Sequence, residues 1–522
     1  MDKFTNPVVY EDLPDPEVIR VGDLYYMSAS SFHFSPGAPL LESRDLVNWE
    51  YIGHSVPELP PSERFTLDGK RPIAYNKGVW ASTLKYRESN GVFYFYTSVQ
   101  GTDSTYIFTS KSPRDDVWTA HPPIDRFYYD LGLLIDDDDT MYIAHGTGTI
   151  QVAQLSSDGM TEVFNKVVYQ TDSYDEGARM YKINGAYYIW LTKEWDAQCV
   201  LKSTNGPFGP YEHRDVIKAM RAPVPGAAPP HQGGLVDTPD GQWYFMAFID
   251  AYPTGRVPVL APVTFSAEGW PSVVADYSIP KGQWLAQYPH ISQNGPAGRP
   301  WTSRKLEFNQ PRLEPYWEWN HNPDNSKWRV QDDQLVLETG TVTDSLHLAT
   351  NTLTHRTVGP GSIITFCLDV SKMADGDRAG LSMFRDKSAY IGIHRTADSA
   401  SLAVQWLNGR PAALDWKCIS KGSIGAEVPL KDDRVWLRVT ADCRAAHEGE
   451  LATVPRKAVF GYSHDGLNFK QLGPAYELPK ESSTFMGERF GLFNFATVAL
   501  GGQVRLSHGN IEIWNPIKVY PS

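Results

Sequence analysis

Short runs of aromatic and aliphatic residues recur along the first half of the chain and predict β-strands. Each run is followed by a second strand pattern and by a turn containing Ser, Asp or Gly, as antiparallel hairpins require. The runs contain a tyrosine every 46 to 68 residues, at Tyr26, Tyr94, Tyr142, Tyr188 and Tyr244. A period of roughly 40 to 50 residues with several strands per unit is typical of a β-propeller blade. The pattern therefore predicts five blades, with a long insertion in the first interval.

One position stands 11 to 14 residues before each of these tyrosines. Its occupants are Asp15, Trp80, Asp130, Glu176 and His231. Equivalent positions in a radial repeat meet at the axis, so we expect these five side chains to line one cavity. Three of the five are carboxylates, although they are far apart in the sequence.

The second half of the chain follows a different pattern. Residues 276–312 have no repeat and contain clusters of Pro, Gly and Ser, after which strand and turn patterns resume at the spacing of a β-sandwich. We expect an all-β protein with a five-bladed propeller at residues 1–290, a linker at 291–312 and a β-sandwich at 313–522.

Charge and composition limit the classes of molecule that the protein can bind. The 522 residues carry a net charge of −13, which argues against nucleic acid or an anionic membrane and is compatible with a neutral substrate. The four cysteines have no CxxC spacing, and no apolar run has transmembrane length. The first residues lack an apolar signal segment and no Asn opens a glycosylation sequon, which slightly favours a cytoplasmic location unless the start is engineered.

The three carboxylates suggest a reaction. Hydrolysis of a glycosidic bond needs one protonated acid at the leaving oxygen and one carboxylate that acts on water or carbon. Asp15, Asp130 and Glu176 supply that pair and one more group, and mutual repulsion would raise the pKa of one member. Asp15 and Glu176 could instead be turn residues, because Asp-Pro and Glu-Gly are common turn dipeptides. The coincidence of three acids in equivalent positions favours the chemical interpretation.

These segments also carry a family resemblance. The segments in the first half are NPVVYEDLPDPEVIRVGDLYYM, YYDLGLLIDDDDTMYI, DEGARMYKINGAYYI and PHQGGLVDTPDGQWYF with the later GRVPVLAPVTF. They resemble glycoside hydrolase family 43, whose members are inverting five-bladed propeller enzymes. The segments in the second half are EWNHNP, DGDRAGLSMFRDKSAYIGIHR and ALGGQVRL. They resemble the concanavalin-like β-sandwich that follows the propeller in the xylosidase and arabinofuranosidase branch of this family. The resemblance covers nearly the whole chain.

The resemblance implies a role for each acid. Asp15 resembles the general base that activates water, and Glu176 resembles the general acid that protonates the departing sugar oxygen. Asp130 resembles the third acid, which tunes the pKa of the general acid and orients it. No cofactor is implied for this chemistry.

Two further polar residues match the family pattern. Arg256 resembles an arginine that approaches the carboxylates from the fifth blade, although a strand-end arginine at the surface is an equal alternative. His231 resembles a histidine near the axis that contacts water or a bound calcium ion, so a structural calcium is compatible with the sequence. A buried histidine with an ordinary hydrogen bond is the simpler interpretation, since calcium prefers oxygen ligands.

Aromatic residues are candidates for the wall of a sugar pocket. Trp80 is the strongest, because its repeat position points inward. The other candidates, for which burial between blades is the alternative, are Phe32, Phe34, Tyr129 and Trp195.

The substrate follows from finer resemblance. The stretch SSFHFSPGAPLLESRDLVNWEYIGHSVPEL looks most like fungal arabinofuranosidases that act on arabinoxylan, whereas LPDPEVIR is closer to the β-xylosidase form of the first motif. We expect an exo-acting enzyme that releases α-L-arabinofuranose from arabinoxylan or arabinan side chains. The alternatives are a β-D-xylosidase, a dual activity, and a non-catalytic carbohydrate-binding propeller. We expect the sandwich to pack against the propeller and shape one side of its mouth.

Overall fold

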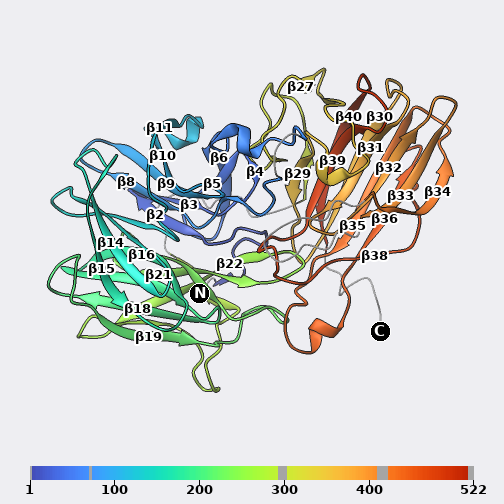
Figure 1. The fold of residues 1–522 in the computed structure, drawn as a ribbon. Coiled ribbons are helices and arrows are strands. Elements are labelled where there is room, and N and C mark those ends of the chain that lie inside the picture. The colour runs from blue at the N-terminus through green and yellow to red at the C-terminus, as the bar shows by residue number, and fades with distance from the viewer. Residues whose placement is uncertain (1–2, 70–72, 292–302, 408–420, 515–522) are drawn as a thin grey trace.

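Nearly all regular elements of the computed structural model are β-strands, which confirms the all-β expectation (Figure 1). The structure describes residues 3–69, 73–291, 303–407 and 421–514. Four short 3-10 helices complete it within these ranges, namely η1 (Ser62–Phe65), η2 (Pro113–Asp115), η3 (Leu346–Leu348) and η4 (Glu450–Thr453). In the described part of the chain, no helix has the length and apolar character needed to cross a bilayer.

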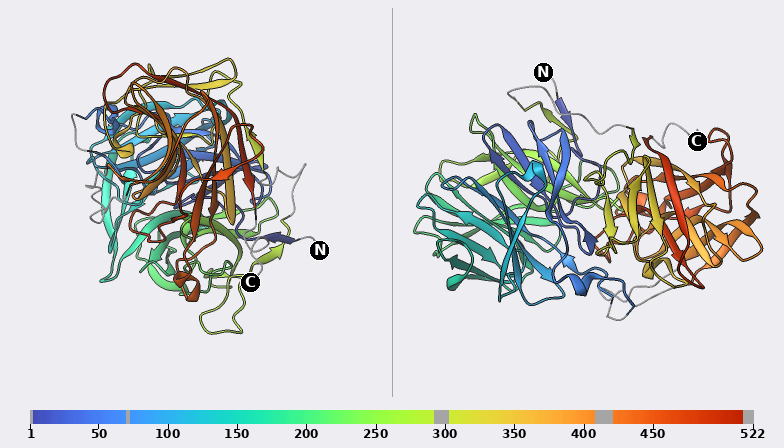
Figure 2. Two further views of the ribbon diagram at one scale, coloured as in Figure 1. Left: turned by 90° about the vertical axis from the view of Figure 1, so that its right-hand side faces the viewer. Right: turned by 90° about the horizontal axis from the view of Figure 1, so that it is seen from above.

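The first half forms five antiparallel sheets around one axis, as the repeat predicts (Figures 1 and 2). Blade I contains β2 (Glu17–Val21), β3 (Leu24–Ser28), β5 (Gly37–Ser43) and β6 (Trp49–Val56). Blade II contains β7 (Gly78–Val79), β8 (Thr83–Arg87), β9 (Val92–Gln100), β10 (Thr105–Ser110) and β11 (Thr119–Ile124). Blade III contains β12 (Gly132–Ile135), β13 (Met141–His145), β14 (Thr149–Leu155) and β15 (Glu162–Gln170).

The remaining blades have the same order. Blade IV contains β16 (Asp175–Ile183), β17 (Ala186–Lys193), β18 (Ala197–Ser203) and β19 (Glu212–Lys218). Blade V contains β20 (His231–Asp237), β21 (Trp243–Asp250), β22 (Arg256–Phe265) and β23 (Pro271–Val273). The two ends of the propeller are joined by pairing of β1 (Lys3–Thr5) with β24 (Gln287–Pro289).

The repeat places the candidate residues at one level of the molecule. The tyrosine runs form the second long strand of each blade, and the preceding strands β2, β8, β12, β16 and β20 contact one another around the axis. The five repeat positions lie at or just before the start of these inner strands. Buried aliphatic and aromatic side chains fill the spaces between blades. The repeat therefore brings five distant positions to one end of the central axis.

The second half is a β-sandwich beside the propeller, as Figure 2 shows. One sheet contains β25 (Arg304–Leu306), β27 (Trp328–Gln331), β28 (Gln334–Glu338), β30 (Gly361–Asp369), β35 (Arg434–Asp442), β36 (Lys457–Ser463), β37 (Lys470–Gln471), β38 (Tyr476–Glu477) and β40 (Gln503–Ile513). The other contains β4 (Phe34–Ser35), β26 (Glu318–Asn320), β29 (Leu353–Arg356), β31 (Asp377–Phe384), β32 (Ser388–Arg395), β33 (Ala400–Leu407), β34 (Ser423–Pro429) and β39 (Arg489–Ala496).

The predicted linker at 291–312 differs from the structure at its end. Residues 292–302 lie outside the described residues, but β25 already pairs with β40 of the sandwich. The sandwich therefore begins before residue 313.

Strand pairing and buried charge join the two halves. β4, in the loop between β3 and β5 of blade I, pairs with β26 of the sandwich. Beside it the fully buried Glu318 accepts hydrogen bonds from Arg356 at 2.9 Å and Arg489 at 2.6 Å within the sandwich, and it lies 3.1 Å from His54 Nε2 of blade I. A loop of the sandwich also reaches the propeller, where the Gly487 N–H donates at 2.8 Å to Asp12, in the segment before β2. A β-carbon on Gly487 would lie 1.6 Å from the Thr254 carbonyl oxygen, so only glycine allows this approach.

Candidate active site

All five repeat positions line one cavity of about 210 Å³ at the end of the propeller axis. Every blade contributes at least one side chain to its wall, and the sandwich contributes Phe485. The wall also includes Tyr129, Arg256 and Phe32, together with the more exposed Tyr174 and Trp195. The structure therefore gathers the three acids into a single small space.

Asp15 is fixed in the loop that enters β2. Its backbone has a φ of 55°, in the left-handed region, and its side chain is 6% exposed. Ser30 Oγ donates to Oδ2 at 2.6 Å, and Arg256 Nη1 lies 3.4 Å from Oδ1. The buried Arg179 donates to the Asp15 carbonyl at 3.2 Å. Both carboxylate oxygens thus have donors, and the backbone is held from blade IV.

Asp130 occupies the equivalent loop before β12. It also has a positive φ, of 50°, and its Oδ2 accepts a hydrogen bond from the Gly177 N–H at 3.0 Å. Burial, followed by the negative charges of Glu176 and Asp15, raises the pKa of Asp130 well above its ordinary value. Asp130 is therefore a group that holds its proton more strongly than an exposed aspartate.

Glu176 projects from the start of β16. Tyr129, the residue before Asp130, donates its hydroxyl hydrogen to Glu176 Oε2 at 3.1 Å. Burial raises the pKa of Glu176, and the charge of Asp15 adds to that effect, whereas the Tyr129 hydrogen bond and Arg256 oppose it. Burial thus exceeds repulsion as the cause, whereas the sequence argument relied on repulsion alone. The raised pKa suits a proton donor.

Among the described residues, Arg256 is the one arginine that lines the cavity. Its side chain contacts Asp15. Its backbone N–H donates to Asp12 at 2.8 Å, and its Nε lies 3.3 Å from Asp250. The guanidinium carbon is 4.7 Å from the centre of the Phe248 ring and 4.8 Å from that of Phe485. Arg256 is therefore buried and held on several sides, and it is not the surface residue of the alternative interpretation.

Aromatic rings form one wall of the cavity. The Trp80 indole N–H donates to the Asn76 carbonyl at 3.1 Å, which fixes the ring. Its ring centre is 6.0 Å from that of Phe32 and 5.7 Å from that of Phe485, both in edge-on arrangements. The three rings form a continuous apolar part of the cavity wall.

The expectation that Phe34 lines the cavity is not met. Its side chain is 4% exposed and lies outside the cavity, with the Arg489 guanidinium 3.5 Å from the ring centre. Phe34 lies in β4, which pairs with the sandwich, whereas Phe32 has a φ of 54° and lines the cavity. The left-handed turn at Phe32 reorients the chain, so the two phenylalanines have separate surroundings.

His231 lies at the first residue of β20 and lines the cavity. Its Nδ1 is 2.9 Å from the Pro229 carbonyl oxygen, so Nδ1 carries the hydrogen of the neutral ring. Burial lowers the pKa of His231. A neutral imidazole with one ring nitrogen left for another partner is the result.

Several site residues had no signal in the sequence argument. Ser30 and Arg179 hold Asp15. The cavity is also lined by Gln232 and Tyr174, and by Phe485 from the other half of the chain. Ser30, Arg179 and Gln232 lie within the quoted stretches SSFHFSPG, DEGARM and PHQGG, but nothing in those stretches marked them as site residues.

The geometry supports acid–base chemistry on one small neutral ring. A raised-pKa carboxyl, a carboxylate held by two donors and an aromatic wall are what glycoside hydrolysis needs. The cavity volume of about 210 Å³ is in the range of a single sugar residue.

Comparison with known proteins agrees with this chemistry. Residues 4–271 match the family described as glycosyl hydrolases family 43, and residues 305–505 match the beta xylosidase C-terminal concanavalin A-like domain. A putative beta-xylosidase of Xylanibacter ruminicola is 32% identical, over 89% of this chain and 82% of that protein. A non-reducing end alpha-L-arabinofuranosidase of Bacteroides ovatus is 29% identical over 63% of each chain.

One solved structure is similar over almost its whole length. It is 43% identical, with a TM-score of 0.92, and the match covers 98% of this chain and 99% of that one. Its title describes active-site engineering of a GH43 glycoside hydrolase that generates an enzyme with both endo-xylanase and exo-arabinofuranosidase activity.

Proposed function

The chain belongs to the glycosyl hydrolases of family 43, which are inverting enzymes, and we propose that it releases terminal α-L-arabinofuranose from the side chains of arabinoxylan or arabinan. The observation that carries this proposal is the cavity of about 210 Å³ in which three acids from three blades meet. The cavity admits one sugar, which supports exo action. The similarity to a structure whose title names exo-arabinofuranosidase activity supports arabinose as that sugar.

Asp15 and Glu176 act on opposite sides of the scissile bond in this proposal. The Glu176 carboxylic acid gives its proton to the glycosidic oxygen as the bond between that oxygen and the anomeric carbon breaks. A water molecule attacks the anomeric carbon from the opposite face and loses a proton to Asp15. The sugar leaves with inverted configuration, and proton exchange with solvent restores both carboxyl groups.

Asp130 and Arg256 position the two reacting groups. Asp130 accepts a hydrogen bond from the Gly177 N–H and so orients the strand that carries Glu176, whereas burial and the charge of Asp15 favour a protonated Glu176. Arg256 Nη1 lies 3.4 Å from Asp15 Oδ1 and holds the carboxylate that accepts a proton from water in this proposal. In this proposal Glu176 enters the reaction as the carboxylic acid and Asp15 as the carboxylate.

Aromatic residues select and hold the substrate. Trp80, Phe32 and Phe485 offer ring faces and edges to the sugar, and Tyr129 offers its hydroxyl. Trp195 is 59% exposed at the rim of the cavity, where it can stack on the polymer outside the cleaved sugar. His231 contacts the sugar or a water molecule. A calcium ion beside His231 stays a prediction, and no step of the reaction is assigned to it.

A β-D-xylosidase is the second candidate, favoured by the name of the Xylanibacter relative. The deciding experiment is proton NMR of the products from singly and doubly substituted arabinoxylan oligosaccharides and from linear xylo-oligosaccharides. We expect free arabinose from the branched substrates, first seen as the inverted anomer, and no xylose. Release of xylose without arabinose would overturn the proposal. The Glu176→Gln variant is the control and should release neither sugar; similar turnover in this variant would contradict the assigned mechanism.

A further inference from the structure

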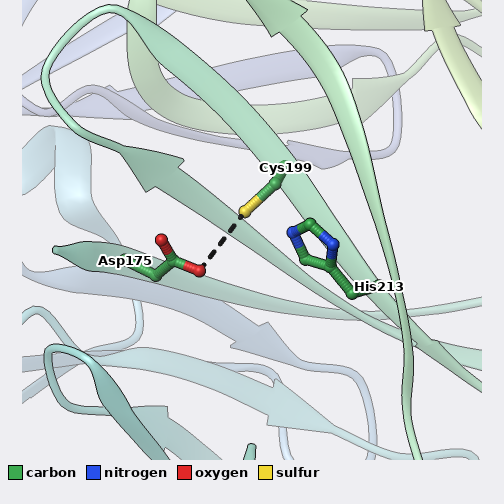
Figure 3. A group of neighbouring side chains, drawn as sticks. All are labelled: Asp175, Cys199 and His213. Carbon is green, nitrogen blue, oxygen red and sulfur yellow. Dashed lines mark hydrogen bonds between the residues drawn. The ribbon is translucent and has the colours of Figure 1, made fainter. Parts of the chain in front are cut away.

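Three side chains with metal-binding atoms meet on the face of blade IV that packs against blade III. Asp175 comes from β16, Cys199 from β18 and His213 from β19, and Figure 3 shows all three directed toward one point. One ligand atom from each lies within 4.8 Å of the other two, and Cys199 Sγ is 3.9 Å from Asp175 Oδ2. Within residues 3–69, 73–291, 303–407 and 421–514, no other group of three His, Cys, Asp or Glu side chains is gathered so closely.

Two of the three groups, Asp175 and His213, are held in place by neighbours outside the cluster. Ser173 donates to Asp175 Oδ1 at 2.6 Å, which directs Oδ2 toward Cys199. The His213 ring stacks on Tyr169 of blade III, with ring centres 5.7 Å apart and an angle of 7° between the planes. Such outer contacts orient ligands at known metal sites.

Burial leaves one of these polar atoms without a hydrogen bond. Asp175 and Cys199 are 1% and 0% exposed. The Nε2 atom of His213 is buried, makes no hydrogen bond and lies 3.6 Å from Asp215 Oδ1. A buried ring nitrogen without a hydrogen bond, facing a thiol and a carboxylate, is the arrangement expected where a cation completes the set.

We propose that Asp175, Cys199 and His213 bind a structural zinc ion. Zinc accepts sulfur, nitrogen and oxygen ligands in one tetrahedral site, whereas calcium and magnesium take oxygen ligands. Zinc bonds of about 2.0 to 2.3 Å place tetrahedral ligand atoms roughly 3.3 to 3.7 Å apart, so small inward rotations of the side chains suffice. The Cys199 thiol gives its proton to solvent as the zinc–sulfur bond forms. The fourth ligand is water or the half-exposed Asp215.

The position of the site indicates a structural role. Alternate residues of a strand point to opposite faces, so Asp175 faces blade III while the next residue, Glu176, faces the catalytic cavity. A zinc ion would tie the strand that carries Glu176 to β18 and β19. Zinc at about 100 times its dissociation constant should raise the thermal midpoint of the protein by about 2 to 3 °C.

The test uses cobalt as a spectroscopic probe and zinc as the competitor. Protein stripped with a chelator and exchanged into chelator-free buffer is titrated with Co²⁺, and then with Zn²⁺. We expect one equivalent of Co²⁺ to produce a near-ultraviolet thiolate-to-cobalt charge-transfer band, and one equivalent of Zn²⁺ to remove it. His213→Ala should weaken zinc binding by about 100-fold or more and abolish the rise in thermal midpoint.

Matched controls separate this site from other thiols and histidines. Cys367→Ala removes a buried thiol in the sandwich, and His464→Ala removes a histidine paired with Asp432, 3.1 Å away, without a nearby thiol. Both variants should keep the cobalt band, whereas Cys199→Ala should lose it. Absence of the band in the unaltered protein, or its persistence in Cys199→Ala, would overturn the proposal. Glycosidase activity tests the proposed function separately, because neither result depends on the other.

Discussion

The molecule has two clusters of buried carboxylates, one at the interface and one in the cavity, and they differ in the number of cationic side chains around them. At the junction of propeller and sandwich, Glu318 contacts Arg356, Arg489 and His54. Burial alone would raise the pKa of Glu318, but the two arginines hold it well below its ordinary value. In the cavity, Asp130 and Glu176 share the space with Asp15, and Arg256 contacts Asp15. The pKa values of Asp130 and Glu176 are raised.

The contrast shows how burial can serve either structure or chemistry. A buried carboxylate with two arginines stays ionised and fixes one packing arrangement. A buried carboxyl group without enough cations keeps its proton near neutral pH and can give it away in a reaction. The ratio of positive to negative groups, and not burial itself, separates Glu318 from the catalytic acids.

Removing the negative charge of Asp15 should give the largest effect on activity. We expect Asp15→Asn to lower kcat by about 10³-fold, because general base catalysis typically contributes 10²- to 10⁴-fold. The variant should unfold at no lower denaturant concentration than the unaltered protein. A kcat within tenfold of that of the unaltered protein would contradict the role of Asp15 as the general base.

Removing the charge of Glu318 should act on stability. Glu318→Gln leaves two buried arginines without their carboxylate, which should lower the free energy of unfolding by about 3 to 5 kcal/mol in denaturant titrations. Glu338→Gln is the control, because the pair of Glu338 with Arg329 is partly exposed and should contribute less than about 1 kcal/mol. Equal losses in both variants would contradict the contrast between buried and exposed pairs.

Glu11, near the same interface, tests the effect of burial on pH dependence. Burial raises its pKa from 4.5 to about 7, although Arg304 and the Tyr51 hydroxyl oppose this. The folded protein holds this proton where the unfolded chain releases it. Stability from Glu11 is therefore full below about pH 4.5 and falls by about 3 kcal/mol as the pH rises to about 7. Glu11→Gln should remove this decline in unfolding titrations across that range, and an unchanged decline would exclude Glu11 as its source.

The smallest expected effect concerns the hydrogen bond to Glu176. Tyr129→Phe removes a donor that favours the ionised form, so the pKa of Glu176 should rise further. The alkaline limb of the kcat/KM profile should move to higher pH, since the acid keeps its proton longer. Tyr128→Phe is the matched control, because the Tyr128 hydroxyl bonds Glu162 outside the cavity. A shift to lower pH, or equal shifts in both variants, would contradict the proposed arrangement.

The repeat in the sequence was sufficient to place the three acids. Tyr26, Tyr142 and Tyr188 mark second strands of blades, and a nearly constant offset from them finds Asp15, Asp130 and Glu176. This works because a radial repeat converts one-dimensional spacing into a common position in space. The fold class followed from the same regularity.

Contacts between the two halves had no comparable signal. Phe485 reaches the cavity from a loop of the sandwich, and its place depends on the close approach of Gly487 to Thr254. The sequence predicted Phe34 as a cavity residue, but Phe34 lies at the interface with the sandwich. The chain turns at Phe32, whose φ is positive, so the two phenylalanines have different surroundings. Long-range docking and single backbone turns do not follow from strand periodicity.

The most direct test of the central claim compares leaving groups in Glu176→Ala. Aryl arabinofuranosides with a very acidic phenol need no proton to depart, whereas those with a weakly acidic phenol do. We predict that Glu176→Ala keeps much of kcat/KM for the former and loses about 10³-fold or more for the latter, while Asp15→Asn loses activity toward both. An equal loss for both leaving groups in Glu176→Ala would contradict the claim that Glu176 is the proton donor of this site.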